Sequence, residues 1–131
     1  VQEVAVNISY EALKYIKNPS DIIEELAIKN NEAAIRFINN LDKEKILRFL
    51  KINILVIKYI AKEITLEELE NILKDKISQE DVEEKYIRDL LRCNIINRNS
   101  EIFNLDKVMF IYKYGSKNAK KIAVDEKLRL A

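Results

Sequence analysis

The sequence contains no histidine and no tryptophan, and only one cysteine, one glycine, one proline and one methionine among its 131 residues. Without histidine, the chain lacks the usual general base of hydrolytic enzymes and most ligand sets of zinc sites. One cysteine forms neither an internal disulfide nor an iron–sulfur cluster, and it favours a reducing, cytoplasmic location. One glycine excludes the glycine-rich loops that hold phosphates in P-loop and dinucleotide-binding proteins. We therefore predict a noncatalytic protein with no metal site and no resident cofactor.

Paired carboxylates remain as candidates for acid–base catalysis or for Mg²⁺ binding. The candidates are the three adjacent Glu-Glu pairs, Glu24-Glu25, Glu67-Glu68 and Glu83-Glu84. Neighbouring residues of a helix point about 100° apart, so the two carboxylates of a pair do not converge on one ligand. Each pair also falls in or near the first turn of a predicted helix, where the macrodipole favours acids. We interpret all three pairs as structural.

The scarcity of glycine and proline indicates a chain of helices joined by short connections. A content of 48% hydrophobic and 34% charged residues is typical of a globular protein, and the length suits one domain. We predict a mainly α fold, in which residues 1–131 form a single compact helical domain around a long buried helix at about 42–61. No apolar run reaches the roughly 20 residues of a membrane span, so we expect no membrane partner.

Local signals place the ends of several helices. Asn7 or Ser9 is suited to cap the first helix, and the stretch Thr65–Glu68 has the pattern of a capping box. Asp106 is a suitable cap for a helix that Gly115 would end. Abundant Lys, Glu and Ile beside little Gln, Cys and Met are typical of a heat-adapted source.

The stretch from Cys93 to Leu105 departs from helical spacing. Two short extended pieces flank the turn-forming residues 97–100, which predicts a small β-hairpin near 94–104. The basic tail, 116–131, is interpreted as a last helix or as a partly ordered segment. We predict no internal repeat.

The predicted helix at 42–61 is apolar around most of its circumference, as expected for a helix in the middle of a domain. A strip about 80° wide interrupts the apolar surface and is mostly basic. Its members are Glu44, Arg48, Lys51, Leu55, Lys58 and Lys62. Arg36 is expected to reach the same end of the helix.

Two interpretations of this strip stay open. In the first, it is the solvated edge of a buried helix, since long basic side chains extend to water while their stems remain packed. In the second, it lines a groove for phosphate, because an Arg fork and Lys point charges both suit that group. Solvated edges usually alternate Glu with Lys, and after Glu44 this strip does not.

The order of signals from Arg48 onward resembles a known family. The pair Arg48-Phe49 opens a long apolar helix, the stretch 65–69 (Thr-Leu-Glu-Glu-Leu) begins the next, and a helix with Tyr86-Ile87 follows. This order, over roughly 42–92, is similar to the helical C-terminal domain of archaeal and eukaryotic primase large subunits. The four cysteines that bind the iron–sulfur cluster of that domain are absent here. A domain of this shape without the cluster looks like PriX, the small third subunit of crenarchaeal primases.

The resemblance implies a noncatalytic subunit of a DNA primase heterotrimer. Its partners would be the catalytic and large subunits, template DNA and the initiating nucleotide, whose 5′-triphosphate it would hold during primer initiation. Arg48 is the one residue assigned to the triphosphate by the resemblance. Lys51, Lys58 and Lys62 are assigned by the strip alone, and Arg36 by its expected proximity.

A second class of function stays open beside this one. Two short helices followed by a hairpin, over 65–105, would suit a winged-helix module that binds DNA or a protein. The recognition helix would be 79–92, but its first turns carry acids where DNA phosphates would lie. A winged helix used for protein contacts, or an adaptor whose acidic segment 63–84 docks a basic partner, avoids this repulsion.

Overall fold

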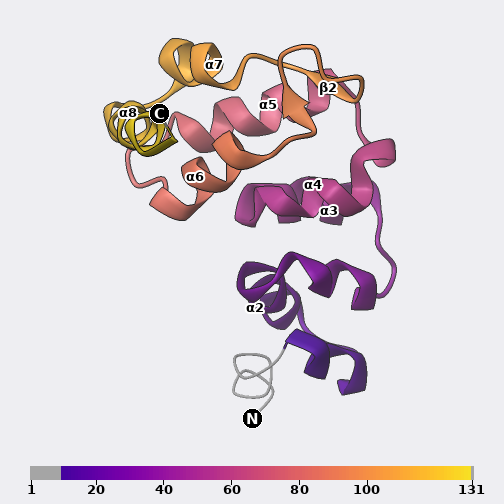
Figure 1. Ribbon diagram of the computed structural model, residues 1–131. Helices are drawn as coiled ribbons and strands as arrows, with labels where there is room; N and C mark the ends of the chain where they lie inside the picture. The colour runs from indigo at the N-terminus through magenta and orange to yellow at the C-terminus, as the bar shows by residue number, and fades with distance from the viewer. Residues whose placement is uncertain (1–9, 131) are drawn as a thin grey trace. The chain divides into compact units, whose positions relative to one another are not determined.

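The structure is a computed structural model that describes residues 10–130, and it confirms a mainly helical fold with a small pair of strands. The caps predicted at Asn7 or Ser9 lie outside the described residues. Where the sequence suggested one domain, the chain divides into two compact units, one up to Ile60 and one from Ala61. Each unit is described by itself (Figure 1).

The first unit alternates α-helices with 3₁₀ helices, which we label η. Its elements are η1 (Tyr10–Tyr15), α2 (Asp21–Asn30), η2 (Glu32–Phe37), α3 (Lys43–Ile52), η3 (Ile54–Val56) and α4 (Ile57–Ile60). Helix α2 packs against α3, and η2 packs against both η1 and η3. The unit is therefore built in layers that follow one another along the chain (Figure 1).

The long helix predicted at about 42–61 is wrong as a continuous element, because the chain breaks at Asn53. This residue is extended, with φ −146° and ψ 105°, and its backbone N–H closes α3 by donating to the Phe49 carbonyl. Its side-chain oxygen accepts from the Leu55 N–H, and its side-chain nitrogen donates to the Ile28 carbonyl of α2. An asparagine side chain that bonds to backbone groups in this way competes with the hydrogen bonds of a helix. Here the bond from Asn53 to α2 determines that α3 ends at this residue.

The first unit also contains an internal repeat of 22 residues, so the prediction of no repeat is wrong. The α-helices of two successive repeats have side-chain caps at Ser20 and Asp42, and each helix is 10 residues long. Each helix ends at an extended asparagine, Asn31 or Asn53, whose side chain caps the 3₁₀ helix that follows. Asn18 and Asn40, again 22 residues apart, both adopt a positive φ, at 52° and 53°.

The repeat is clearest in sequence at the η elements. Residues 12–16 read Ala-Leu-Lys-Tyr-Ile, residues 34–38 read Ala-Ile-Arg-Phe-Ile, and residues 56–60 read Val-Ile-Lys-Tyr-Ile. The second residue of each stretch, Leu13, Ile35 or Ile57, is buried. A layered array of this kind buries a continuous core between neighbours, since no single repeat can enclose its own apolar face.

The second unit combines α-helices with a short pair of strands. Its elements are η4 (Ala61–Glu63), α5 (Leu66–Ile77), α6 (Glu84–Arg92), β1 (Ile96–Asn97), β2 (Phe103–Asn104), α7 (Lys107–Tyr114) and α8 (Lys117–Leu130). The predicted capping box is confirmed, with the Thr65 hydroxyl accepting from the Glu68 N–H and the Glu68 carboxylate accepting from the Thr65 N–H. Asp106 caps α7 and Gly115 ends it, as predicted.

The strands near 94–104 form a small pair, but they run parallel and not as the predicted hairpin. Ile96 lies opposite Phe103, and both side chains are buried. The Ser100 hydroxyl donates to the Ile95 carbonyl and accepts from the Phe103 N–H, which curls the connecting loop back beside β1. The stretch therefore lacks the antiparallel wing that a winged-helix module would use.

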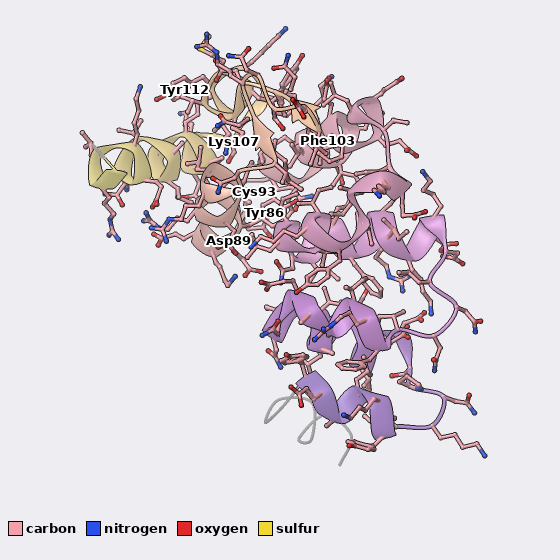
Figure 2. The ribbon with its side chains drawn as sticks, turned by 45° about the vertical axis from the view of Figure 1, so that its right-hand side comes forward. Tyr86, Asp89, Cys93, Phe103, Lys107 and Tyr112 are labelled. Carbon is pink, nitrogen blue, oxygen red and sulfur yellow. The ribbon has the colours of Figure 1, made fainter. Side chains whose placement is uncertain are left out.

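The basic tail forms α8, which packs against α6 and α7. Its buried face presents Ala119, Ile122 and Ala123 to the interior of the unit. Tyr86 and Cys93 at the two ends of α6 are also buried there (Figure 2), and burial raises the pKa of the Tyr86 hydroxyl. The small, buried Cys93 fills space in this core.

Candidate ligand-binding site

Helices α6 and α8 are joined by a carboxylate between two guanidinium groups. Glu126 of α8 is fully buried and contacts Arg88 at 2.5 Å and Arg92 at 2.6 Å. Arg88 also binds the exposed Asp125 at 2.8 Å. The hydrogen bond from Arg88, with Arg92 adding to it, holds the pKa of the Glu126 carboxyl below its usual range. This cluster fixes the position of α8 on α6.

Lys107, the first residue of α7, is buried and points at the C-terminal end of α6 (Figure 2). Its ammonium nitrogen donates to the Leu91 carbonyl at 3.0 Å and to the Cys93 carbonyl at 2.8 Å. Burial lowers the pKa of this ammonium group. A cation at this point offsets the negative end of the helix dipole and satisfies carbonyls that α6 leaves without a helical partner.

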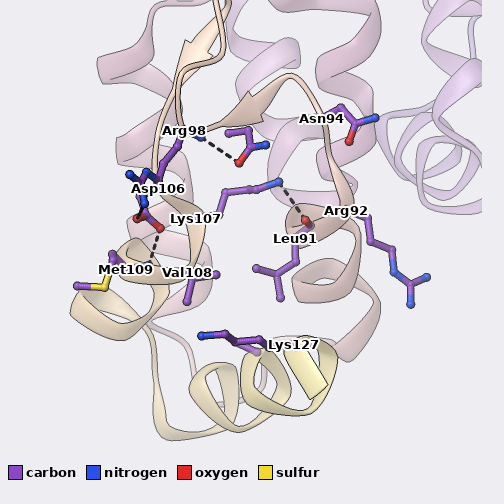
Figure 3. Close-up of a pocket in the computed structure, with 11 residues that line it drawn as sticks. Leu91, Arg92, Asn94, Arg98, Asp106, Lys107, Val108, Met109 and Lys127 are labelled. Carbon is purple, nitrogen blue, oxygen red and sulfur yellow. Dashed lines mark hydrogen bonds and ion pairs between the residues drawn. The ribbon is translucent and has the colours of Figure 1, made fainter. Parts of the chain in front are cut away.

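A cavity of about 880 Å³ opens beside these groups, entirely within the second unit (Figure 3). The end of α6, the strand β1, the start of α7 and the middle of α8 surround it. It is lined by Leu91, Arg92, Asn94, Asn97, Arg98, Asp106, Lys107, Val108, Met109, Ala123 and Lys127. Four of these side chains are basic, and one is acidic.

The basic side chains lie around an apolar surface. Figure 3 shows Leu91, Val108 and Met109 along the cavity, with Lys127 reaching in from α8. The one acid, Asp106, is already used, since it accepts from the Met109 N–H as the cap of α7 and lies 4.0 Å from Arg98. A basic rim over an apolar surface suits an anion that carries an apolar part.

Asp106 is the one carboxylate among the side chains that line the cavity, and its contacts with the Met109 N–H and Arg98 hold it in place. Over residues 10–130, no group of three or more acidic or cysteine side chains is arranged to hold a metal ion. The arrangement can bind and orient a ligand through charge and hydrogen bonding.

The five residues predicted to hold phosphate are not brought together along one helix. Arg48 lies on α3, where its guanidinium contacts Glu25 at 3.0 Å and Asp21 at 3.7 Å, both on α2. Its neighbour Lys45 contacts the buried Glu24 at 3.1 Å. These ion pairs join successive repeats, so a triphosphate at Arg48 would have to displace two carboxylates.

Of the other four residues, only Lys51 shares α3 with Arg48; Lys58 and Lys62 follow the break at Asn53, and Arg36 precedes the loop before α3. Lys51 is half-buried at the end of α3. Lys58 and Arg36 are exposed, one on α4 and one on η2. Lys62 is exposed in η4 and belongs to the second unit.

The residues of the cavity were not predicted from the sequence. Arg92 ends the segment 79–92 that a winged helix would use for recognition, Arg98 lies in the turn 97–100, and Lys127 lies in the basic tail. The useful signal was the charge distribution, since residues 85–131 carry 11 basic and 5 acidic side chains. That excess indicates a cationic region, but the approach of α7 and α8 to the end of α6 decides where it becomes a cavity.

No protein-family model, curated protein or solved structure matches this chain. The resemblance to primase subunits therefore rests on the residues that suggested it, and the identity it implies stays a prediction. Over residues 10–130, no helix combines the length and apolar character needed to cross a membrane.

Proposed function

We propose that this chain is a noncatalytic binding protein that takes up a nucleotide-type phosphorylated ligand in the cavity of its second unit. The observation that carries the proposal is the set of four basic side chains around one apolar surface, opposed by a single carboxylate. Phosphate oxygens would replace water at the basic rim, and the base would cover the apolar surface.

The four basic side chains differ in how available they are to bind a ligand, because some already bind other groups of the protein. Arg98 is 72% exposed, and its contact with Asp106, at 4.0 Å in open solvent, is weak. Lys127 is exposed at the opposite side of the cavity (Figure 3). We therefore assign the phosphate contacts first to Arg98 and Lys127. Arg92 and Lys107 support them with charge, since both are already engaged with the protein.

The narrower form of the proposal is the third subunit of a DNA primase heterotrimer, which holds the 5′-triphosphate of the initiating nucleotide. Its support is the resemblance over 42–92, together with the basic side chains around the cavity. The triphosphate would then be held by the cavity of the second unit, because Arg48 is already paired with carboxylates of α2.

Titration with ATP and GTP, followed by calorimetry at low and moderate salt, tests the site. We expect Arg98→Ala and Lys127→Ala each to weaken triphosphate binding about tenfold, as for the loss of one charge-assisted contact. Lys120→Ala, an exposed basic residue of α8 outside the cavity lining, is the matched control and should leave the affinity unchanged. Unchanged triphosphate affinity in both cavity variants would refute the proposed site. If only Arg48→Ala lost affinity, the binding site would lie at α3 instead.

The subunit identity has a separate test. The chain, mixed with the catalytic and large primase subunits of the same genome, should elute with them in size-exclusion chromatography as a heterotrimer. The Arg98→Ala variant should still assemble, because the cavity is assigned to the ligand. If the wild type did not enter the complex, the primase identity would be refuted. The proposed nucleotide site would not be affected by that result.

A further inference from the structure

The repeat of the first unit places a basic residue and then an aromatic residue at the same position of each repeat. These six residues, which we call the basic–aromatic ladder, are Lys14, Tyr15, Arg36, Phe37, Lys58 and Tyr59. All three basic residues are exposed. Tyr15 is 80% exposed and Tyr59 is 47% exposed, and Phe37 between them is half-buried. Exposed tyrosines at equivalent positions of two repeats are not explained by the core.

The first two rungs of the ladder touch each other. The Lys14 ammonium lies 5.0 Å from the ring centre of Tyr15 and 5.8 Å from that of Phe37 in the next repeat. The Arg36 guanidinium lies 5.8 Å from the same Phe37 ring. The third rung, Lys58 and Tyr59, lies on α4, which packs on η3, and η3 in turn packs on η2.

The cations of the ladder are not the ones that pair with the acids of α2. Lys45 and Arg48, on α3, are paired with the acids of α2. Within residues 10–60 of the described chain, no carboxylate is in an ion pair with a cation of the ladder. Glu11 and Glu32 lie in the first turns of η1 and η2, one turn before Lys14 and Arg36.

We infer that the first unit binds single-stranded nucleic acid along the basic–aromatic ladder. Backbone phosphates would lie at the three cations, and unpaired bases would stack on the exposed rings. Cations that follow the backbone, combined with aromatic side chains that accept any base, are the general means of binding single strands without sequence preference. A duplex would meet the same charge, but its paired bases could not reach the rings. This inference is independent of the nucleotide site in the second unit.

Fluorescence anisotropy of a labelled oligothymidine of about 12 nucleotides tests the inference, with a duplex of the same length measured beside it. The wild type should bind the single strand more tightly than the duplex. The triple variant Lys14→Ala/Arg36→Ala/Lys58→Ala should lose single-strand binding at moderate salt. Each single replacement should reduce the slope of log affinity against log salt by about 0.7.

The aromatic residues give a second, independent signature. Tyr15→Ala and Tyr59→Ala should each weaken single-strand binding about fivefold or more and leave the salt slope unchanged, because stacking releases no counterions. Both tyrosines are exposed, so the variants should fold as the wild type does. Ile22→Ala, which removes another exposed apolar side chain on α2, is the matched control for the rings, and Lys29→Ala on the same helix is the control for charge.

Three results would overturn the inference. The triple variant could bind the single strand as tightly as the wild type. The duplex could bind equally well with no effect of the tyrosine replacements, which would indicate attraction by charge alone. A polyglutamate peptide of equal charge could compete as well as the oligonucleotide, which would make the ladder a surface for an acidic protein.

Discussion

Replacing Asn53 with aspartate is expected to lower the free energy of unfolding by about 3 kcal/mol, as for a buried donor replaced by a charge. The Asn53 side chain is 5% exposed and donates to the Ile28 carbonyl at 2.9 Å. The introduced carboxylate would lose this donor and face the carbonyl oxygen of α2 with a negative charge, out of reach of water. Urea denaturation followed by far-ultraviolet circular dichroism measures the loss.

The repeat supplies the control for this experiment. Asn31 occupies the same position one repeat earlier, where its side chain is half-buried and accepts from the Ala33 N–H at 2.9 Å. Asn31→Asp keeps that acceptor, and the added negative charge is favourable at the start of η2 but unfavourable at the end of α2, so the two effects oppose each other. We expect its cost to stay within about 0.5 kcal/mol. Equal losses in the two variants would show that the bond from Asn53 to Ile28 is not what ends α3.

Replacing Glu126 with glutamine is expected to lower the thermal midpoint by several degrees, and by more than Asp125→Asn. Glu126 is fully buried between Arg88 and Arg92, whereas Asp125 is half exposed and binds Arg88 from the outside. Glutamine keeps the shape of the side chain but leaves two guanidinium groups facing a neutral amide. The variants therefore compare a buried and an exposed partner of the same arginine.

The same variant has a defined pH dependence. The pKa of Glu126 is lowered in the folded protein, chiefly by the hydrogen bond from Arg88. Its stabilisation is therefore fully present above the ordinary glutamate pKa and is lost as the pH falls through the depressed folded value. Thermal midpoints measured from neutral to acid pH should fall less steeply for Glu126→Gln than for the wild type. Parallel curves would show that this carboxylate does not contribute to acid unfolding.

The ends of several helices could be predicted because their signals are local. The capping box of Thr65 and Glu68, the cap at Asp106 and the end at Gly115 each depend on residues a few positions apart. The helical class followed for a similar reason, since few glycines and prolines leave few places for turns. These features need no knowledge of the tertiary structure.

The break at Asn53 could not be predicted in the same way. Apolar residues continue at helical spacing on both sides of it, so the pattern of 42–61 is that of one helix. The break depends on a carbonyl 25 residues away, that of Ile28. A comparison at a spacing of 22 residues reveals it, because Asn31 ends α2 one repeat earlier and Asn53 occupies the same position.

The candidate site was missed because its charges are redistributed by tertiary contacts. In the sequence, Arg48 is part of a basic strip, whereas in the fold it faces Glu25 and Asp21. In contrast, the cavity forms only where α8 lies against α6, and that packing depends on a buried carboxylate 34 residues from Arg92. Charge counted along a helix does not show which cations other helices neutralise.

Because the first unit is built from 22-residue repeats, its length can change in evolution by the gain or loss of whole repeats. The main contacts of η2 are with the layers before and after it, η1 and η3, so a duplicated or deleted copy would mainly disturb one junction. Every added copy would bring its own cation and ring at a fixed pitch. Binding strength and footprint would then scale with copy number, without the invention of a new contact.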